Sequence, residues 1–349
     1  MGAACARPEA VPEAAVTAAP TATATVSPAP TAVPTPSPTP DPLTAENGVY
    51  TFAWLSDTQF YSNKFPDVFH AMTEFLSKER ARLNLAYVIH TGDLVSWADR
   101  ENDWIVARHA MDALDGVPYG VLAGNHDVTP YADRKNLSNA NYIAYFGGAS
   151  LTENACCADI YEDGRGHVDL ISAGETDYAF CYMGYPVDEK GAEWLNGRFA
   201  AYKDRVGVLC VHDYLNTDLT RTEQGQFLFD TVVAKNDNLY MVLCGHRYNS
   251  HTVPIEVQNA DGSARTVLQC ISNYQAAGLE GGSGYLRFIQ VNEANGTLHM
   301  LNYSPLLNDY VYYDDLENIY DPYFFDPAGE DETTPIPWRQ HFAAAAPQP

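Results

Sequence analysis

The sequence has few basic residues and no long apolar run. Its 349 residues include 20 Lys and Arg against 45 Asp and Glu, so the formal net charge is −25. This charge excludes binding of nucleic acid or of an anionic membrane through the general surface. Because no apolar run reaches the roughly 18 residues that a membrane-spanning helix needs, the sequence predicts no such helix. The chain is nevertheless long enough, at 46% hydrophobic residues, to bury a large core.

Several sequence patterns of enzymes are also missing. The seven cysteines match no zinc-binding spacing. Cys156 and Cys157 are adjacent, which makes them poor disulfide partners for each other, although a disulfide from one of them to a distant cysteine stays open. There is no Walker-type phosphate loop and no convincing Ser-His-Asp or Cys-His arrangement. Catalysis by a protein nucleophile is therefore not indicated.

Residues 1–45 differ in composition from the rest of the chain. They are mostly Ala, Thr, Pro, Ser and Val, which cannot bury a core, so we expect a disordered, partly extended tether. Cys5 follows three small residues and precedes this tether, a pattern similar to the start of a bacterial lipoprotein. On this interpretation the protein is extracytoplasmic, either secreted or held at the cell surface by a lipid on Cys5. The alternative is an unanchored linker with an incidental cysteine.

Residues 46–340 are expected to form one domain that begins with alternating strands and helices. Such β-α-β-α-β alternation predicts a largely parallel sheet that binds its ligands at the carboxyl ends of the strands. The expected strands are residues 50–55, 86–90 and 119–123, and the expected helices begin at Pro66 and lie around residues 104–114.

The second half of the domain predicts a second sheet. We expect an antiparallel strand pair, two helices that alternate with two further strands, and then only strands. In order, the expected ranges are 168–172, 178–183, 188–202 (helix), 206–211, 222–235 (helix), 239–244, 251–258, 265–273, 284–292 and 297–303. Two packed sheets with helices outside follow from this pattern. The acidic, aromatic segment 308–340 should wrap the domain, and residues 341–349 should be loose.

Short polar segments follow the apolar runs of the expected strands. Their Asp, Asn, Gln and His residues are the ligand types of a hydrolytic metal site. Each residue alone has a simpler explanation, such as a helix cap, a turn or a polar strand end. Because all of them lie at strand ends, we predict at least one bound metal. The candidate residues are Asp57, Gln59, Asp93, Asn125, His126, Asp127, His212, His246 and Tyr248.

Four of these segments resemble the calcineurin-like metallophosphoesterase superfamily. They are Gly92-Asp93, Gly124-Asn125-His126-Asp127, His212 and Gly245-His246, in the family's order. The resemblance extends over about residues 50–303. It implies a four-layer α/β/β/α sandwich and two divalent or mixed-valence metal ions (Mn, Fe or Zn). It also implies hydrolysis of phosphomonoesters or phosphodiesters, in small molecules or polymers, by a metal-bound hydroxide.

The resemblance also implies a role for each candidate residue. Asp93 would bridge the two metals. Asn125, His212 and His246 would complete one site, and Asp57 would serve the other together with positions 59 and 248. His126 would protonate the leaving group or contact the phosphate, and Asp127 could orient its imidazole.

Two residues depart from the family pattern, and both belong to the same metal position. Gln59 and Tyr248 stand where the family has histidines. Gln59 can offer a carbonyl oxygen. Tyr248 could bind as a phenolate or leave the position to water, and His251 is the alternative ligand. Three interpretations therefore stay open: a working binuclear enzyme, a mononuclear hydrolase, or a cell-surface binding module that has lost catalysis.

Overall fold

The computed structural model describes residues 41–46, 48–130, 137–162, 164–278, 280–315, 318 and 325–339. Cys5, most of the expected tether and the expected loose tail lie outside the described residues, so the expectations about them stay predictions. The end of the expected tether is already part of the folded body, because Leu43 is fully buried and Asp41 pairs with Arg82 at 2.7 Å. None of the described helices is long and apolar enough to cross a membrane.

The first sheet has the strand order β13-β12-β11-β1-β2-β3, with β14 paired to β12. Strands β1, β2 and β3 are parallel, whereas β11 runs antiparallel to β1. The bounds are β1 Val49–Leu55, β2 Leu85–His90, β3 Tyr119–Val121, β11 Leu286–Asn292, β12 Thr297–Ser304, β13 Asp309–Tyr310 and β14 Asp331–Pro335. The parallel half of this sheet confirms the expected β-α-β-α-β unit, although β3 is two residues shorter than expected.

The second sheet has the strand order β4-β5-β6-β7-β8-β10-β9. Strands β6, β7, β8 and β10 are parallel, and β4, β5 and β9 complete the sheet in antiparallel pairs. The bounds are β4 Cys157–Tyr161, β5 Gly166–Ala173, β6 Thr176–Met183, β7 Val206–Cys210, β8 Leu239–Cys244, β9 Asn249–Gln258 and β10 Ala264–Asn273. The expected antiparallel pair is present as β5 and β6.

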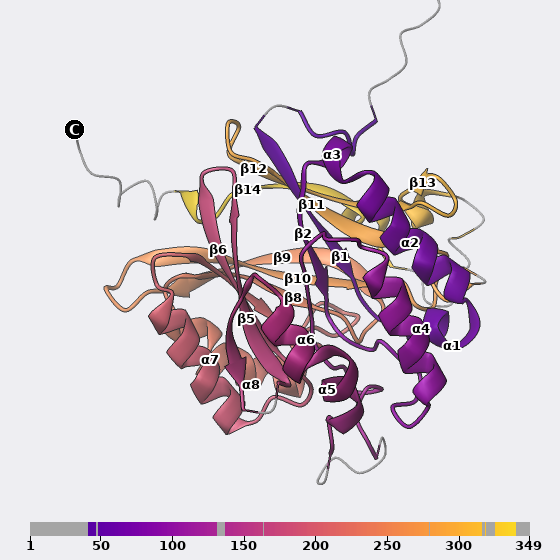
Figure 1. The fold of residues 1–349 in the computed structure, drawn as a ribbon. Coiled ribbons are helices and arrows are strands. Elements are labelled where there is room, and N and C mark those ends of the chain that lie inside the picture. The colour runs from indigo at the N-terminus through magenta and orange to yellow at the C-terminus, as the bar shows by residue number, and fades with distance from the viewer. Residues whose placement is uncertain are drawn as a thin grey trace, which may run out of the picture. The chain divides into compact units, whose positions relative to one another are not determined.

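The two sheets pack face to face between two layers of helices (Figure 1). Alternate residues of β1 show why: Phe52 and Trp54 lie in the core between the sheets, whereas Ala53 and Leu55 face the outer helices. Both faces of β1 are therefore buried, which explains its continuous apolar run. The four-layer α/β/β/α sandwich is the observed architecture.

The helices cover the outer faces of the two sheets. On the first sheet lie α1 (Gln59–Lys64), α2 (Pro66–Lys78), α4 (Glu101–Asp112) and α5 (Ala140–Phe146); α3 (Arg80–Leu83) and α6 (Gly148–Glu153) are short connections. On the second lie α7 (Glu189–Ala201) and α8 (Glu223–Thr231). Asp188 and Thr222 cap α7 and α8 through their side chains instead of belonging to them.

The described part of the C-terminal segment packs against the folded body. Strand β14 adds to the first sheet beside β12, and Trp338 is buried between the sheets. The fully buried Arg287 of β11 donates to Glu332 of β14 and to Ser250 of β9. A single guanidinium therefore connects the C-terminal strand to both sheets.

We predict that Glu332→Ala lowers the free energy of unfolding by about 3–5 kcal/mol, because it leaves a buried guanidinium without its counter-charge. Chemical denaturation measured by circular dichroism checks this value. The exposed Glu256 on β9 is the matched control, and its replacement by Ala should change the stability by less than about 1 kcal/mol. Equal effects of both substitutions would contradict a structural role for the Arg287–Glu332 pair.

Candidate metal centre

The candidate residues lie where parallel strands of both sheets end. Asp57, Asp93 and Asn125 follow β1, β2 and β3 of the first sheet, and His212 and His246 follow β7 and β8 of the second. The carboxyl ends of these strands meet at one edge of the sandwich. Backbone hydrogen bonds tie the loops to each other, from Asp57 N–H to the Gly92 carbonyl at 2.9 Å and from Gly245 N–H to the His212 carbonyl at 3.0 Å.

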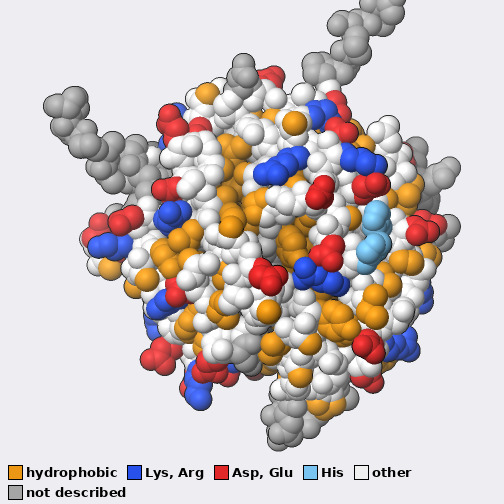
Figure 2. Space-filling view, viewed as in Figure 1, with side chains coloured by type: hydrophobic (Ala, Val, Ile, Leu, Met, Phe, Trp, Pro, Cys, Tyr) orange, Lys and Arg blue, Asp and Glu red, His pale blue; other side chains and the backbone are white. Residues whose placement is uncertain are grey.

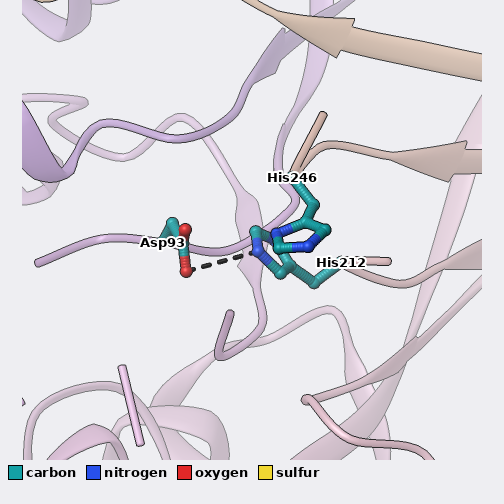
Figure 3. A group of neighbouring side chains, drawn as sticks. All are labelled: Asp93, His212 and His246. Atoms are coloured by element: carbon teal, nitrogen blue, oxygen red, sulfur yellow. Dashed lines mark ion pairs between the residues drawn. The ribbon is translucent and has the colours of Figure 1, made fainter. Parts of the chain in front are cut away.

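Three side chains form the centre of the site. One potential ligand atom from each of Asp93, His212 and His246 lies within 4.8 Å of those of the other two. Figure 3 shows the two imidazole rings next to each other, with Asp93 reaching His212 from the opposite side. Asp93 and His212 are buried. One carboxylate and two imidazoles at this spacing are a suitable donor set for Mn, Fe or Zn.

The ring of His212 is held in one orientation. Its Nδ1 lies 2.9 Å from the carbonyl oxygen of Thr91, which fixes Nδ1 as a donor. Its Nε2 lies 3.3 Å from Asp93 Oδ1 and 3.0 Å from Asn125 Oδ1. Two oxygen atoms therefore converge on one ring nitrogen, and the three atoms together require a positive centre.

The pKa values of Asp93 and His212 also reflect the need for a positive charge between them. Burial lowers the pKa of His212, but the charge of Asp93 and its hydrogen bond outweigh burial and raise that pKa to about 10. Burial would raise the pKa of Asp93, yet the charge of His212 holds it well below the usual range. Either a proton on His212 or a metal ion can supply the positive charge, so a bound metal fits these residues.

Asp57 and Gln59 lie on the other side of Asp93. The carboxylate of Asp57 accepts from the backbone N–H of His246 at 3.0 Å and from Ser56 Oγ at 2.6 Å, and burial raises its pKa. Gln59 donates from Nε2 to Asp93 Oδ2 at 3.1 Å, while its Oε1 is buried without a hydrogen-bond partner among the described residues. A buried amide oxygen without a partner suits a cation ligand.

The hydroxyl groups behind Asp57 were not predicted from the sequence. Trp54 Nε1 donates to Thr91 Oγ1 at 2.9 Å, Thr91 donates to Ser56 Oγ at 2.7 Å, and Ser56 donates to Asp57. This chain fixes the Asp57 carboxylate. The only sequence signal was that Ser56 and Thr91 immediately precede candidate loops.

Three of the candidate ligands have strained backbones. Asp57, Asp93 and His246 adopt positive φ angles of 55°, 56° and 68°. Non-glycine residues rarely take this conformation, and those that do concentrate at functional sites. The strain turns each side chain into the space between the loops.

The structure corrects the expected role of Asp127. Its buried carboxylate accepts from three backbone N–H groups, those of Gly124 at 2.8 Å, Leu94 at 3.0 Å and Val95 at 2.9 Å. It therefore holds the loops after β2 and β3 together instead of orienting the His126 imidazole. This explains its burial in a segment that otherwise carries site residues.

His126 is half-buried beside the metal centre. Its backbone N–H donates to Asp93 Oδ1 at 2.9 Å, and its ring Nδ1 lies 3.0 Å from the Ser96 carbonyl oxygen. A donor at Nδ1 directs the other ring nitrogen away from Ser96, which suits a residue that gives or receives a proton there.

The remaining candidates lie after β8. Tyr248 is half-buried two residues after His246, and its role as a ligand stays a prediction. The suggestion that His251 replaces it was wrong: His251 already lies in β9, and its Nδ1 is 3.4 Å from Glu332, in the network that holds the C-terminal strand.

We predict that Gly245→Ala lowers metal affinity by about 10–100-fold, the usual cost of disturbing groups that orient ligands. A Cβ atom at residue 245 would collide with Ser56 Oγ and Asp57 Oδ2. Calorimetric titration with Mn²⁺ measures the effect.

Gly197 provides the control for this substitution. It lies in α7, where a Cβ atom would meet nothing within 4 Å. Gly197→Ala should leave metal affinity unchanged and stabilise the fold by roughly 0.5–1 kcal/mol. If Gly245→Ala binds Mn²⁺ as tightly as this control does, Asp57 is not positioned by the close contact with residue 245.

The chain is similar to one much longer protein in sequence and to several solved structures of low sequence identity. Over 270 residues it is 38% identical to the uncharacterised protein YvnB of Bacillus subtilis (strain 168). That match covers 76% of this chain but 21% of YvnB, so the chain spans about a fifth of the length of this relative.

Among solved structures, purple acid phosphatase PPD1 of yellow lupin has a TM-score of 0.49 and 12% identity, over 76% of this chain and 53% of that one. GAP50, the anchor in the inner membrane complex of Plasmodium, has the same TM-score and identity, over 86% and 95%. The profile of the family described as Calcineurin-like phosphoesterase matches residues 50–249. The chain therefore belongs to the calcineurin-like phosphoesterase family, whose members are metal-dependent.

Proposed function

We propose that this protein hydrolyses phosphomonoesters or phosphodiesters at the edge of the sandwich where Asp93, His212 and His246 meet. The convergence of these three ligand groups within 4.8 Å carries the proposal. Asn125, Asp57 and the unpartnered oxygen of Gln59 extend the donor set on both sides of Asp93. We propose that the site would hold two metal ions, drawn from Mn, Fe and Zn, and that Asp93 would contribute to binding both.

Such ions, when bound, hold the phosphate, generate a nucleophile from water and stabilise the leaving oxygen. The chain's own residues fix the geometry. Thr91 orients His212, the hydroxyls of Ser56 and Thr91 orient Asp57, and Asp127 holds the loops that carry Asp93 and Asn125.

His126 is the residue proposed to act on the substrate. The Ser96 carbonyl holds a proton on its Nδ1, so the opposite ring nitrogen is the one that would contact the phosphate or protonate the leaving oxygen. Its backbone N–H remains on Asp93 and keeps the ring close to the metal centre.

The net charge of −25 opposes an anionic substrate. Local cations must outweigh this charge, and two divalent ions at the site would do so. Removal of the metal is therefore expected to lower activity more than it lowers the stability of the fold.

We predict that Asp93→Asn and His212→Ala each lower kcat/KM for p-nitrophenyl phosphate and for bis(p-nitrophenyl) phosphate by more than about 100-fold, beyond the cost of losing an outer-shell partner. Both variants should also lose bound metal. Replacing the peripheral His299 of β12 by Ala is the control and should leave both properties unchanged. Normal turnover by either site variant would overturn the assignment.

A second function is favoured by one observation at Gln59. The amide nitrogen of this residue donates to Asp93, where the family has a histidine ligand. A weakened first metal position is the expected consequence, and the protein would then act as a binding module on the cell surface that has lost catalysis.

Restoring the family residues separates the two functions. If the protein is the proposed enzyme, wild type is active and Gln59→His with Tyr248→His brings less than a tenfold gain in kcat/KM. If the wild type is inactive and the double variant gains phosphoesterase activity, the binding-module function is correct. Steady-state assays with both substrates, after loading with Mn²⁺, distinguish these results.

A further inference from the structure

Two histidines lie side by side on the outer surface, on the helices that cover the first sheet. His70 belongs to α2 and His109 to α4, and their ring centres are 5.3 Å apart with an angle of 30° between the ring planes. His70 is half-buried and His109 is exposed. Figure 2 shows adjacent histidine side chains on the side of the molecule where α2 and α4 lie in Figure 1.

We propose that His70 and His109 bind a divalent transition metal, Zn²⁺, Ni²⁺ or Cu²⁺, as a site separate from the catalytic centre. Imidazole is a preferred ligand of these ions. Zn–N bonds of about 2.0–2.1 Å in a tetrahedral site place two ring centres roughly 5 Å apart, which is the separation observed here. Because α2 and α4 pack into one core, the backbones that carry the two rings keep a fixed separation.

The third donor in this proposal is a carboxylate that would have to turn toward the pair, because His70, His109 and Glu74 do not bring three ligand atoms within 4.8 Å of one another as they lie. Glu74 lies one helical turn beyond His70 on α2 and pairs with Lys78 at 2.8 Å. The hydrogen bond and charge of Lys78 lower the pKa of Glu74, and the charge of His70 contributes in the same direction. The carboxylate on α4, Asp112, is already paired with Arg108 at 2.9 Å. Both carboxylates are ion-paired, but only Glu74 lies one helical turn from His70 and is influenced by its charge, so Glu74 is the carboxylate proposed to exchange Lys78 for the metal.

The site would fasten α2 to α4. Phe69 and Met72 of α2 and Trp104 and Met111 of α4 pack into one core against the first sheet. A metal bound by both histidines would connect α2 and α4 on their solvent side, outside this core. This inference does not depend on the proposed phosphoesterase activity, because none of its three ligands belongs to the catalytic centre.

Zn²⁺ content after equilibrium dialysis at micromolar free Zn²⁺ tests the site. We expect wild type to bind one Zn²⁺ more per chain than His70→Ala, His109→Ala or the double variant. Glu74→Gln should lower the affinity for this ion about tenfold. His299→Ala, which removes a histidine elsewhere on the surface, should keep the full content. Phosphoesterase activity should be the same in all six proteins.

Thermal unfolding provides a readout that is independent of stoichiometry. With Zn²⁺ at about 100 times its Kd for this site, the Tm of wild type should exceed that of the double variant by roughly 5 °C, and the difference should vanish with a chelator. The chelator measurement also shows whether the variants fold normally. Equal Zn²⁺ content in wild type and the double variant, or binding only at millimolar Zn²⁺, would overturn the proposal.

Discussion

The structure depends on one electrostatic constraint: the buried carboxylate of Asp93 and the amide oxygen of Asn125 both approach Nε2 of His212. Asp93 comes from the first sheet and His212 from the second, so the contact also joins the two halves of the sandwich. Two oxygens and a ring nitrogen at this spacing are stable only around a positive charge. The site where the carboxyl ends of the parallel strands meet therefore needs a positive charge.

The rest of the site follows from keeping these loops close together. The loops after β1 and β8 approach so closely that a Cβ atom at residue 245 would collide with Asp57. The backbones of Asp57, Asp93 and His246 take left-handed conformations to turn the side chains inward. Asp127 stabilises the arrangement by accepting three backbone N–H groups. Stability and metal binding therefore share the same hydrogen bonds.

The sequence predicted the elements that have a strong pattern and missed those that do not. The apolar run of β1 and the polar residues after it located Asp57 at a strand end, whereas Gln59 is the first residue of the short helix α1, which was not predicted. Strand β14, with the sequence DETTP, has no apolar alternation and forms because β12 and Arg287 provide partners. The role of Asp127 could not be predicted, because its partners Leu94 and Val95 are more than thirty residues away and meet it only in the folded chain.

The departures at positions 59 and 248 were also visible in the sequence, but their consequence was not. Gln59 reaches Asp93 through its amide nitrogen, which leaves the amide oxygen buried and without a partner among the described residues. Rotation of the amide group by half a turn would exchange the two atoms and place the oxygen beside Asp93. The side chain is thus compatible with a filled first metal position.

The most direct test is anomalous X-ray diffraction at the manganese edge from crystals grown with Mn²⁺. We expect two anomalous peaks that flank Asp93, one bonded to His212, His246 and Asn125 and one next to Asp57 and Gln59. Absence of any peak bonded to His212 would show that this site binds no metal, because the convergence of Asp93 and Asn125 on the His212 ring would then be satisfied by a proton alone.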